Sequence, residues 1–191
     1  MRLTDDRYAR ERAQLELALR MIRHEARTMT IRACTGLSDD RIRKLYATYF
    51  KSDSQLKIRR RRGKSPRRTG FLVRNAHNQF ESTTLVILFA LCALVRPARE
   101  GRSLDAAGDC GLETGARFCS AYETYTRLHH PPRISFEWAW NLLGAVTRSH
   151  ELYLSTCARC GNVYVQDALA LDPRRCPCCR MKAAARAIAA I

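Results

Sequence analysis

Two cysteine pairs near the end of the chain decide the local fold there: Cys-Ala-Arg-Cys-Gly at residues 157–161 and Cys-Pro-Cys-Cys-Arg at residues 176–180. Fifteen residues, 161–175, separate the two C-x2-C pairs, a spacing typical of four-cysteine zinc sites. Each C-x2-C turn can direct two thiolates at one ion, and two turns complete a closed tetrahedral shell. The sequence therefore predicts one structural Zn2+ per chain, with the ligands Cys157, Cys160, Cys176 and Cys179.

Cys178 is the surplus cysteine of the second pair. If it replaced Cys176 or Cys179, the spacing would become C-x-C or C-C, so we expect it not to be a ligand. Thiol redox chemistry is the competing interpretation of C-x-x-C, but no βαβ pattern surrounds these residues. A closed four-cysteine shell also leaves no position for a catalytic water. The cysteines in or near apolar helical stretches read as packing residues: Cys34, Cys92, Cys110 and Cys119.

The charge balance of the chain points to a polyanionic partner. The 191 residues include 34 Lys plus Arg against 18 Asp plus Glu, for a net charge of +16. Nucleic acid is the first candidate partner and an anionic membrane surface is the second. The longest apolar run, residues 85–95, is shorter than the roughly 20 residues of a membrane-spanning helix. The first residues lack the apolar core of a signal peptide, so we expect a cytoplasmic protein.

The pattern of apolar residues predicts a mainly α fold. Three- and four-residue spacing indicates an amphipathic helix over residues 5–29, packed on the chain's own core or on a partner subunit. Further helices are expected over residues 29–34, 38–50, 75–95 and 134–154, with two more in 103–129 that are broken near Gly111 or Gly115. The 75–95 helix is apolar almost all round, so we expect it to be buried on every side and to end at Pro97.

The C-terminal part has a different pattern, which consists of short segments bounded by cysteines. Residues 162–165 are its best strand candidate. The predicted organisation is a helical domain that binds partner and DNA (1–150), a zinc ribbon-like module (151–180) and a tail with a frayed helix (181–191).

Residues 31–45 have the layout of a helix-turn-helix. Gly36 occupies the turn, and the small core between the two helices would consist of Ile31, Leu37, Ile42 and Leu45. The second helix would carry the candidate DNA contacts Arg41, Arg43 and Lys44. Asp39 and Asp40 would face DNA unfavourably at its start, so an αα-hairpin that packs internally or against a partner remains an alternative.

Residues 51–70 lack periodicity and predict a strongly basic loop. Such a loop suits counterion release from phosphate, which positions a protein without reading sequence. The candidate phosphate contacts are Arg59, Arg60, Arg61, Arg62, Lys64, Arg67 and Arg68. The alternative is a solvated charge run without a partner.

No arrangement typical of an active site stands out. The five His residues are scattered, and no Gly-rich phosphate loop follows a strand. The paired carboxylates, Asp5 with Asp6 and Asp39 with Asp40, lie at helix starts, where capping accounts for them. We therefore expect a protein that is not an enzyme.

Taken together, these features resemble the FlhC family of bacterial flagellar transcriptional activator subunits, over about residues 8 to 180. The most specific parts are Arg43-Lys44-Leu45-Tyr46, the entry Leu-Tyr-Leu-Ser-Thr-Cys at residues 152–157, and the two cysteine pairs. The order and spacing of these parts carry the resemblance.

The resemblance implies a mostly helical, zinc-containing subunit that acts with FlhD as a hetero-hexamer of four FlhD and two FlhC chains. It implies binding to double-stranded promoter DNA and recruitment of RNA polymerase to flagellar operons. In that family the four paired cysteines bind zinc, which carries the role to Cys157, Cys160, Cys176 and Cys179. A zinc-containing RNA-binding or ribosome-associated protein is the alternative from another class, and an interaction-only scaffold is a third.

Overall fold

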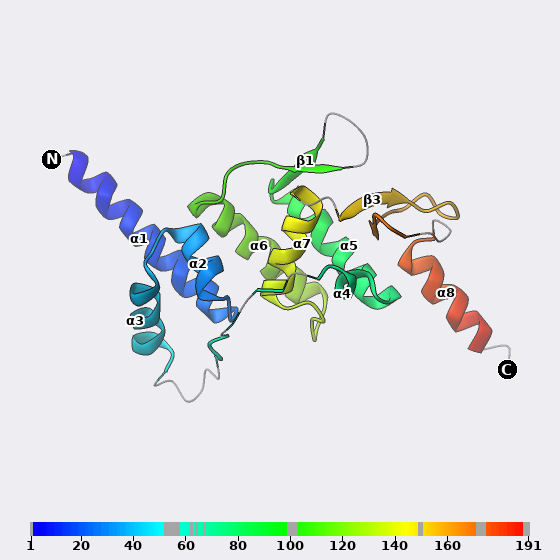
Figure 1. Ribbon diagram of the computed structural model, residues 1–191, viewed down its shortest axis with the longest axis horizontal. Helices are drawn as coiled ribbons and strands as arrows, with labels where there is room; N and C mark the ends of the chain where they lie inside the picture. The colour runs from blue at the N-terminus through cyan, green and yellow to red at the C-terminus, as the bar shows by residue number, and fades with distance from the viewer. Residues whose placement is uncertain are drawn as a thin grey trace. The chain divides into compact units, whose positions relative to one another are not determined.

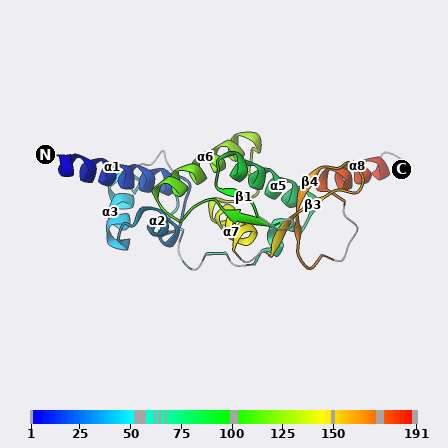
Figure 2. The same ribbon diagram turned by 90° about the horizontal axis from the view of Figure 1, so that it is seen from above.

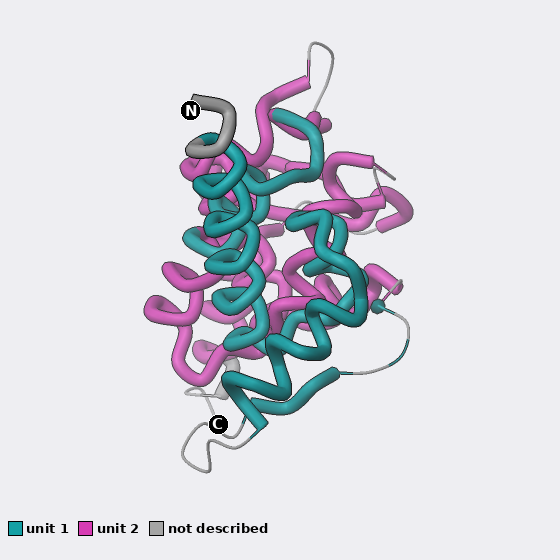
Figure 3. Tube along the Cα trace, turned by 90° about the vertical axis from the view of Figure 1, so that its left-hand side faces the viewer, with its two compact units in different colours: residues 1–65, 108–120 teal, residues 66–107, 121–191 magenta. Residues whose placement is uncertain are grey.

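The computed structural model describes residues 2–51, 58–61, 63, 65–66, 68–98, 103–148, 151–170 and 175–188. These residues are mainly helical, which confirms the expected fold class. The chain forms two compact units, residues 1–65 with 108–120 and residues 66–107 with 121–191 (Figure 3). In the described ranges, each helix is too short or too polar to cross a lipid bilayer.

The first unit is built on three helices, α1 (Arg2–Arg23), α2 (Thr28–Thr35) and α3 (Asp39–Tyr49), which pack against one another (Figure 1). The first half of α6 (Leu112–Leu128) belongs to the same unit. Its core consists of apolar side chains from α1, α2 and α3, including Leu17, Met21, Ile22, Ile31 and Ile42.

The prediction of a single helix over residues 5–29 is wrong, because α1 ends at Arg23. The amide of Ala26 donates to the Met21 carbonyl at 3.1 Å, and the amide of Glu25 donates to Ile22 at 2.9 Å. Glu25 has a φ of 57°, so the end of α1 is a Schellman motif with a glutamate in the left-handed position. The apolar face expected along this helix is buried only in part: Tyr8 is 74% exposed, and among the described side chains of α1, from residue 6 onward, the buried ones begin at Leu17.

The break expected near Gly111 or Gly115 is also absent, because α6 is one helix that runs through Gly115. A Cβ atom at Gly115 would lie 2.8 Å from the Cβ of Cys34 and 2.8 Å from a methyl carbon of Leu17. Glycine here allows α6 to approach the other helices of its unit closely. It is a packing residue and does not end the helix.

The second unit contains α4 (Gly70–Val73), α5 (Ala76–Leu91), α7 (Phe136–Thr147), α8 (Pro177–Ile188) and the rest of α6. It also contains two antiparallel hairpins, β1 (Val95–Pro97) with β2 (Leu104–Ala106) and β3 (Leu152–Thr156) with β4 (Val163–Asp167). The side chain of Asn75 caps α5 by accepting from the amide of Asn78 at 2.8 Å. Helices α5 and α7 pack together around buried residues such as Phe89 and Leu142.

Helix α5 differs from its expectation in two ways. It ends at Leu91, because Ala93 takes a φ of 52° and the amide of Leu94 returns to the Phe89 carbonyl at 2.8 Å. Pro97 instead lies in β1. The helix is not buried all round either, since Ile87 is 49% and Leu91 is 77% exposed.

Helix α7 also ends earlier than expected, at Thr147, and residues 152–154 of the predicted helix belong to β3. The strand expected over 162–165 is confirmed as β4, and α8 begins at Pro177 and continues through the described part of the tail to Ile188. Both tryptophans are half-buried, and the ring of Trp138 lies against Phe71 with 4.7 Å between centroids.

A buried carboxylate organises the turn between α6 and α7. Glu81 accepts a hydrogen bond from the hydroxyl of Tyr125 and another, at 2.9 Å, from the backbone amide of Arg133. The amide of Ile134 donates to the same hydroxyl at 3.0 Å. Burial, reinforced by the bond to Glu81, raises the pKa of Tyr125 above its usual value, so the hydroxyl stays protonated and donates.

We expect Tyr125→Phe to destabilise the second unit. The substitution removes one donor from the buried Glu81 carboxylate and leaves the amide of Ile134 without its acceptor, at a cost of about 1–3 kcal/mol in free energy of unfolding. Denaturant unfolding measures the change. The matched control is Tyr49→Phe, which removes a hydroxyl from a side chain that is 57% exposed. Equal stability of the two variants would contradict a structural role for the network.

Candidate metal centre

The four paired cysteines are held by one hairpin and one helix. Cys157 directly follows β3, and Cys160 lies in the turn that leads to β4. Cys176 directly precedes α8, and Cys179 lies in its first turn. In Figures 1 and 2 the start of α8 lies beside the β3 and β4 hairpin. The fold of the second unit therefore brings the two pairs together, as their spacing predicts.

Local backbone geometry shapes each pair. In the first, the amide of Gly161 donates to the carbonyl of Cys157 at 2.9 Å, and the amide of Cys157 donates to Asn162 at 2.9 Å. Gly161 has a φ of 73°, which favours glycine in this turn. In the second pair, Pro177 is the first residue of α8, a position that suits its fixed φ and missing N–H.

The sulfur positions fit a tetrahedral ion. The four Sγ atoms lie within 4.8 Å of one another. Two of the separations are 3.9 Å, between Cys157 and Cys179, and 3.5 Å, between Cys160 and Cys176. Four thiolates bound tetrahedrally at about 2.3 Å would be separated by about 3.8 Å. The group can therefore hold a metal ion with only small side-chain adjustments.

Backbone amides prepare one of these thiols for ionisation. The amide of Cys176 donates to the Sγ of Cys157 at 3.3 Å and lowers the pKa of Cys157 to about 6. Burial instead raises the pKa of the Cys176 thiol to about 12. A metal cation at the centre would supply the charge that ionises the remaining thiols. Three exposed arginines follow or flank the pairs, Arg159, Arg175 and Arg180, whereas Arg174 lies outside the described residues.

Cys178 does not belong to the four-sulfur group, in agreement with its expected role as a non-ligand. It is half-buried and packs against the small core of the module, which contains Tyr164 and three of the cysteines. Cys160 is the exposed member of the group. Because so few side chains form this core, the cysteines dominate the interior of the module.

Helix α5 anchors the module through polar side chains. Gln79 donates to the carbonyl of Val165 at 2.8 Å and accepts from Arg180 at 3.1 Å. The hydroxyl of Thr83 accepts from the amide of Val165 at 3.1 Å. Sequence reasoning missed Gln79 and Thr83. The sequence signal that could have identified them is the presence of polar residues in an otherwise apolar helix. In the structure both side chains are buried.

The hairpin of α2 and α3 has the core that was expected for residues 31–45. Gly36 takes a φ of 72°, and the side chain of Ser38 caps α3 by accepting from the amide of Arg41 at 3.3 Å. Ile31, Leu37 and Ile42 are buried, and Leu45 is half-buried.

The candidate DNA contacts on α3 are exposed, but two of them have acidic neighbours. Arg43 pairs with Asp40 at 2.7 Å, and Arg41 pairs with Glu11 of α1. The Arg41 bond lowers the pKa of Glu11. Lys44 is exposed on the same helix.

Part of the basic run has a defined position on the first unit. Residues 58–61 form no helix or strand, but Glu25 accepts from the amide of Arg59 at 3.2 Å and from the guanidinium of Arg61 at 2.7 Å. Tyr46 donates to the carbonyl of Ile58 at 2.9 Å. Arg62, Lys64 and Arg67 lie outside the described residues, and Arg68 is exposed in the second unit.

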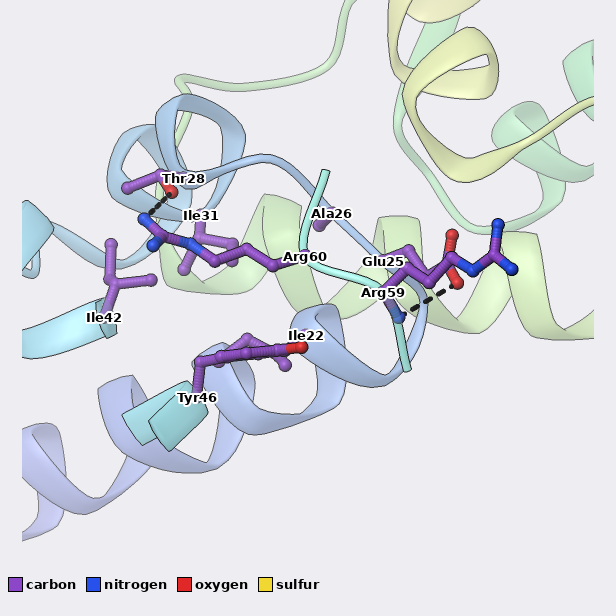
Figure 4. Close-up of a pocket in the computed structure, with 9 residues that line it drawn as sticks. All are labelled: Ile22, Glu25, Ala26, Thr28, Ile31, Ile42, Tyr46, Arg59 and Arg60. Carbon is purple, nitrogen blue, oxygen red and sulfur yellow. Dashed lines mark hydrogen bonds between the residues drawn. The ribbon is translucent and has the colours of Figure 1, made fainter. Parts of the chain in front are cut away.

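The close-up in Figure 4 shows how Arg59 and Arg60 differ. Arg60 reaches across the hollow between Ile31 and Tyr46 toward the hydroxyl of Thr28, 3.4 Å away. Arg59 extends away from that hollow. The hydrogen bonds from the Arg59 amide and the Arg61 guanidinium to Glu25 form what we call the Glu25 clamp. It could not be predicted, because the sequence pattern of residues 51–70 contains no sign of a distant acidic partner.

No family model matches this chain, and no curated protein matches it. Two features of the described residues bear on its function: the four-cysteine group, and the exposed basic side chains of α3 and of residues 58–61.

Proposed function

We propose that the chain is a DNA-binding subunit of a transcriptional activator, of the FlhC type, that acts with an FlhD-type partner on flagellar or other operons. The observation that carries the proposal is the set of exposed basic side chains on the first unit. They include Arg43 and Lys44 of α3 and Arg59, whose backbone amide donates to Glu25. The net charge of +16 favours a polyanionic partner.

The acidic neighbours of these side chains do not block phosphate binding. In the Arg43–Asp40 pair the two side chains are 55% and 79% exposed. Ion pairs this exposed contribute about 0–1 kcal/mol, so Arg43 can exchange Asp40 for a phosphate at little cost. Asp39 and Asp40 lie in the first turn of α3, where they also stabilise the helix dipole.

For the metal centre we propose one Zn2+ per chain in a structural role. Four soft thiolate ligands in a tetrahedral arrangement suit zinc, or iron as the competing ion. The four protein ligands would fill the shell, so the ion would stabilise the module and leave no position for substrate. The absence of an enzymatic activity remains a prediction.

The arginine run is expected to bind phosphate. Replacing Arg59, Arg62 and Arg68 by Gln should weaken binding to specific and random duplexes by similar factors. It should also flatten the slope of log K against log salt by about 0.9 per lost contact. The matched control removes three exposed charges from α1, at Arg7, Arg10 and Arg12. A salt titration of both triple variants measures the difference, and an unchanged slope in the first would make the run a solvated loop.

Substitutions on α3 should affect sequence discrimination instead. If the helix reads bases, Arg43→Ala and Lys44→Ala should each reduce the difference in binding affinity between a duplex selected from a random library and a random duplex. The expected loss is about 1–3 kcal/mol per bidentate contact. Competition with single-stranded RNA completes the test. RNA that displaces duplex DNA efficiently would favour the alternative of a zinc-containing RNA-binding protein.

Co-expression tests the proposed partner. The exposed apolar side chains Phe80, Ile87 and Leu91 on α5 should make the chain poorly soluble alone. An FlhD-type protein should raise the soluble yield if it covers them. Analytical ultracentrifugation then reports whether the two chains form a hetero-oligomer of the expected four-to-two composition. A stable monomer that ignores FlhD would count against the FlhC-type assignment.

A further inference from the structure

Two cysteines outside the metal centre form a second thiol pair. The Sγ atoms of Cys34 and Cys110 lie 4.0 Å apart, within the first unit. Cys34 belongs to α2, and Cys110 lies two residues before α6 begins. The thiol of Cys110 also donates to the carbonyl of Ala33 at 3.3 Å, so the two backbone segments are adjacent. We propose that Cys34 and Cys110 are an oxidation site that forms a reversible intramolecular disulfide.

The two thiols differ in access, which sets the order of the chemistry. Cys110 is exposed, in contrast to the packing role expected from the sequence, whereas Cys34 is 1% exposed. Oxidation of a cysteine follows its accessibility and thiolate character. A small oxidant therefore meets Cys110 first, and Cys34 is the resolving thiol beside it.

With a hydroperoxide as oxidant, both steps balance. The sulfur of Cys110 attacks the peroxide oxygen, the O–O bond breaks, and the products are a sulfenic acid and water or an alcohol. The sulfur of Cys34 then attacks the sulfur of that sulfenic acid and displaces its hydroxyl group, which leaves as a second water with the Cys34 proton. Two thiols lose two electrons in total, and the peroxide gains them. A dithiol reductant reverses the reaction by thiol exchange.

The local backbone allows the sulfurs to meet. A disulfide bond is about 2.05 Å long, so the 4.0 Å separation must close by about 2 Å. Cys110 lies between Gly108 and Gly111, and a Cβ atom at either glycine would meet nothing within 4 Å. Cys34 is packed against Gly115, whose added Cβ would lie 2.8 Å from the Cys34 Cβ. Cys110 is therefore the side that moves, and the bond would fasten the start of α6 to α2.

Trypsin separates these two cysteines cleanly. Cleavage after arginine gives residues 33–41, with Cys34 as their single cysteine, and residues 103–117, with Cys110 as theirs. The full chain, loaded with zinc and fully reduced, is treated with stoichiometric hydrogen peroxide and then alkylated. We expect a disulfide-linked pair of these peptides in the mass spectrum, which disappears on reduction. This readout does not depend on DNA binding, so it stands or falls separately from the proposed function.

Two variants sharpen the test. Cys110→Ser should abolish the linked pair and leave Cys34 open to alkylation once the protein is unfolded. Cys92→Ser, at the half-buried end of α5 in the other unit, should leave it unchanged. The proposal is overturned if peroxide converts Cys110 to a sulfinic acid while Cys34 remains a thiol. It is also overturned if peroxide links Cys110 of the native chain to a cysteine other than Cys34.

Discussion

Cys160→Ser is expected to abolish metal binding although it removes almost no packing. Cys160 is the exposed member of the group, so a serine of similar size loses little buried surface. It does lose one of the four proposed thiolate ligands. Structural zinc sites contribute about 10–16 kcal/mol of apparent binding free energy, which is also folding free energy. We therefore expect complete loss of the ion and unfolding of residues 151–188, measured by elemental analysis and by amide hydrogen exchange.

Cys178→Ser is the matched control, because Cys178 is half-buried and lies one residue from the proposed ligand Cys179. It should keep about one zinc per chain with near-native exchange rates, whereas Cys157→Ser and Cys176→Ser should behave like Cys160→Ser. Equal metal loss in the Cys178 variant would refute the ligand assignment, and an iron content equal to the protein content would replace zinc by iron.

Gly115→Val is expected to destabilise the first unit strongly. Already the first added carbon would lie 2.8 Å from the Cys34 Cβ and 2.8 Å from Leu17, two side chains of the buried core. Overpacking of this kind costs about 1–3 kcal/mol, and the two extra methyl groups of valine place the variant at or above the upper end. Thermal unfolding followed by circular dichroism measures the loss.

Gly111→Ala provides the comparison for that substitution. Nothing lies within 4 Å of a Cβ atom built at Gly111, and its φ is not positive. Alanine there should be neutral or slightly stabilising, because it restricts the unfolded chain. If Gly115→Val melts at the native temperature, the close approach at Gly115 is not a constraint on the fold.

The helix ends explain which parts of the fold could be predicted from sequence. Ser38 and Asn75 cap their helices through their own side chains, so the starts of α3 and α5 were readable locally. Helices α1 and α5 end in Schellman motifs whose left-handed residues are Glu25 and Ala93. Glycine normally marks that position, and without it the sequence gives no stop signal. For this reason the predicted ranges of both helices extend beyond their observed ends at Arg23 and Leu91.

The candidate functional residues also include a part that the sequence predicts and a part that it does not. The two cysteine pairs were predictable because their spacing alone determines how four sulfurs can meet one ion. The position of residues 58–61 was not, since it depends on Glu25, more than thirty residues away in sequence, as the separation of 36 between Glu25 and Arg61 shows. Likewise, the pairing of Cys34 with Cys110 spans 76 residues and has no local signature.

The bonds from Gln79 and Thr83 to Val165 have a consequence for self-association. They occupy both backbone groups of Val165 on the side of β4 that faces away from β3. An open strand edge is a template on which another chain can add a strand and begin an aggregate. Here the side chains of Gln79 and Thr83 bond the backbone of Val165, so a further strand cannot pair with β4 at that residue. If loss of a bound ion unfolded the module, these bonds would be lost with it, and the backbone of β4 would be open to pairing with a strand of another chain.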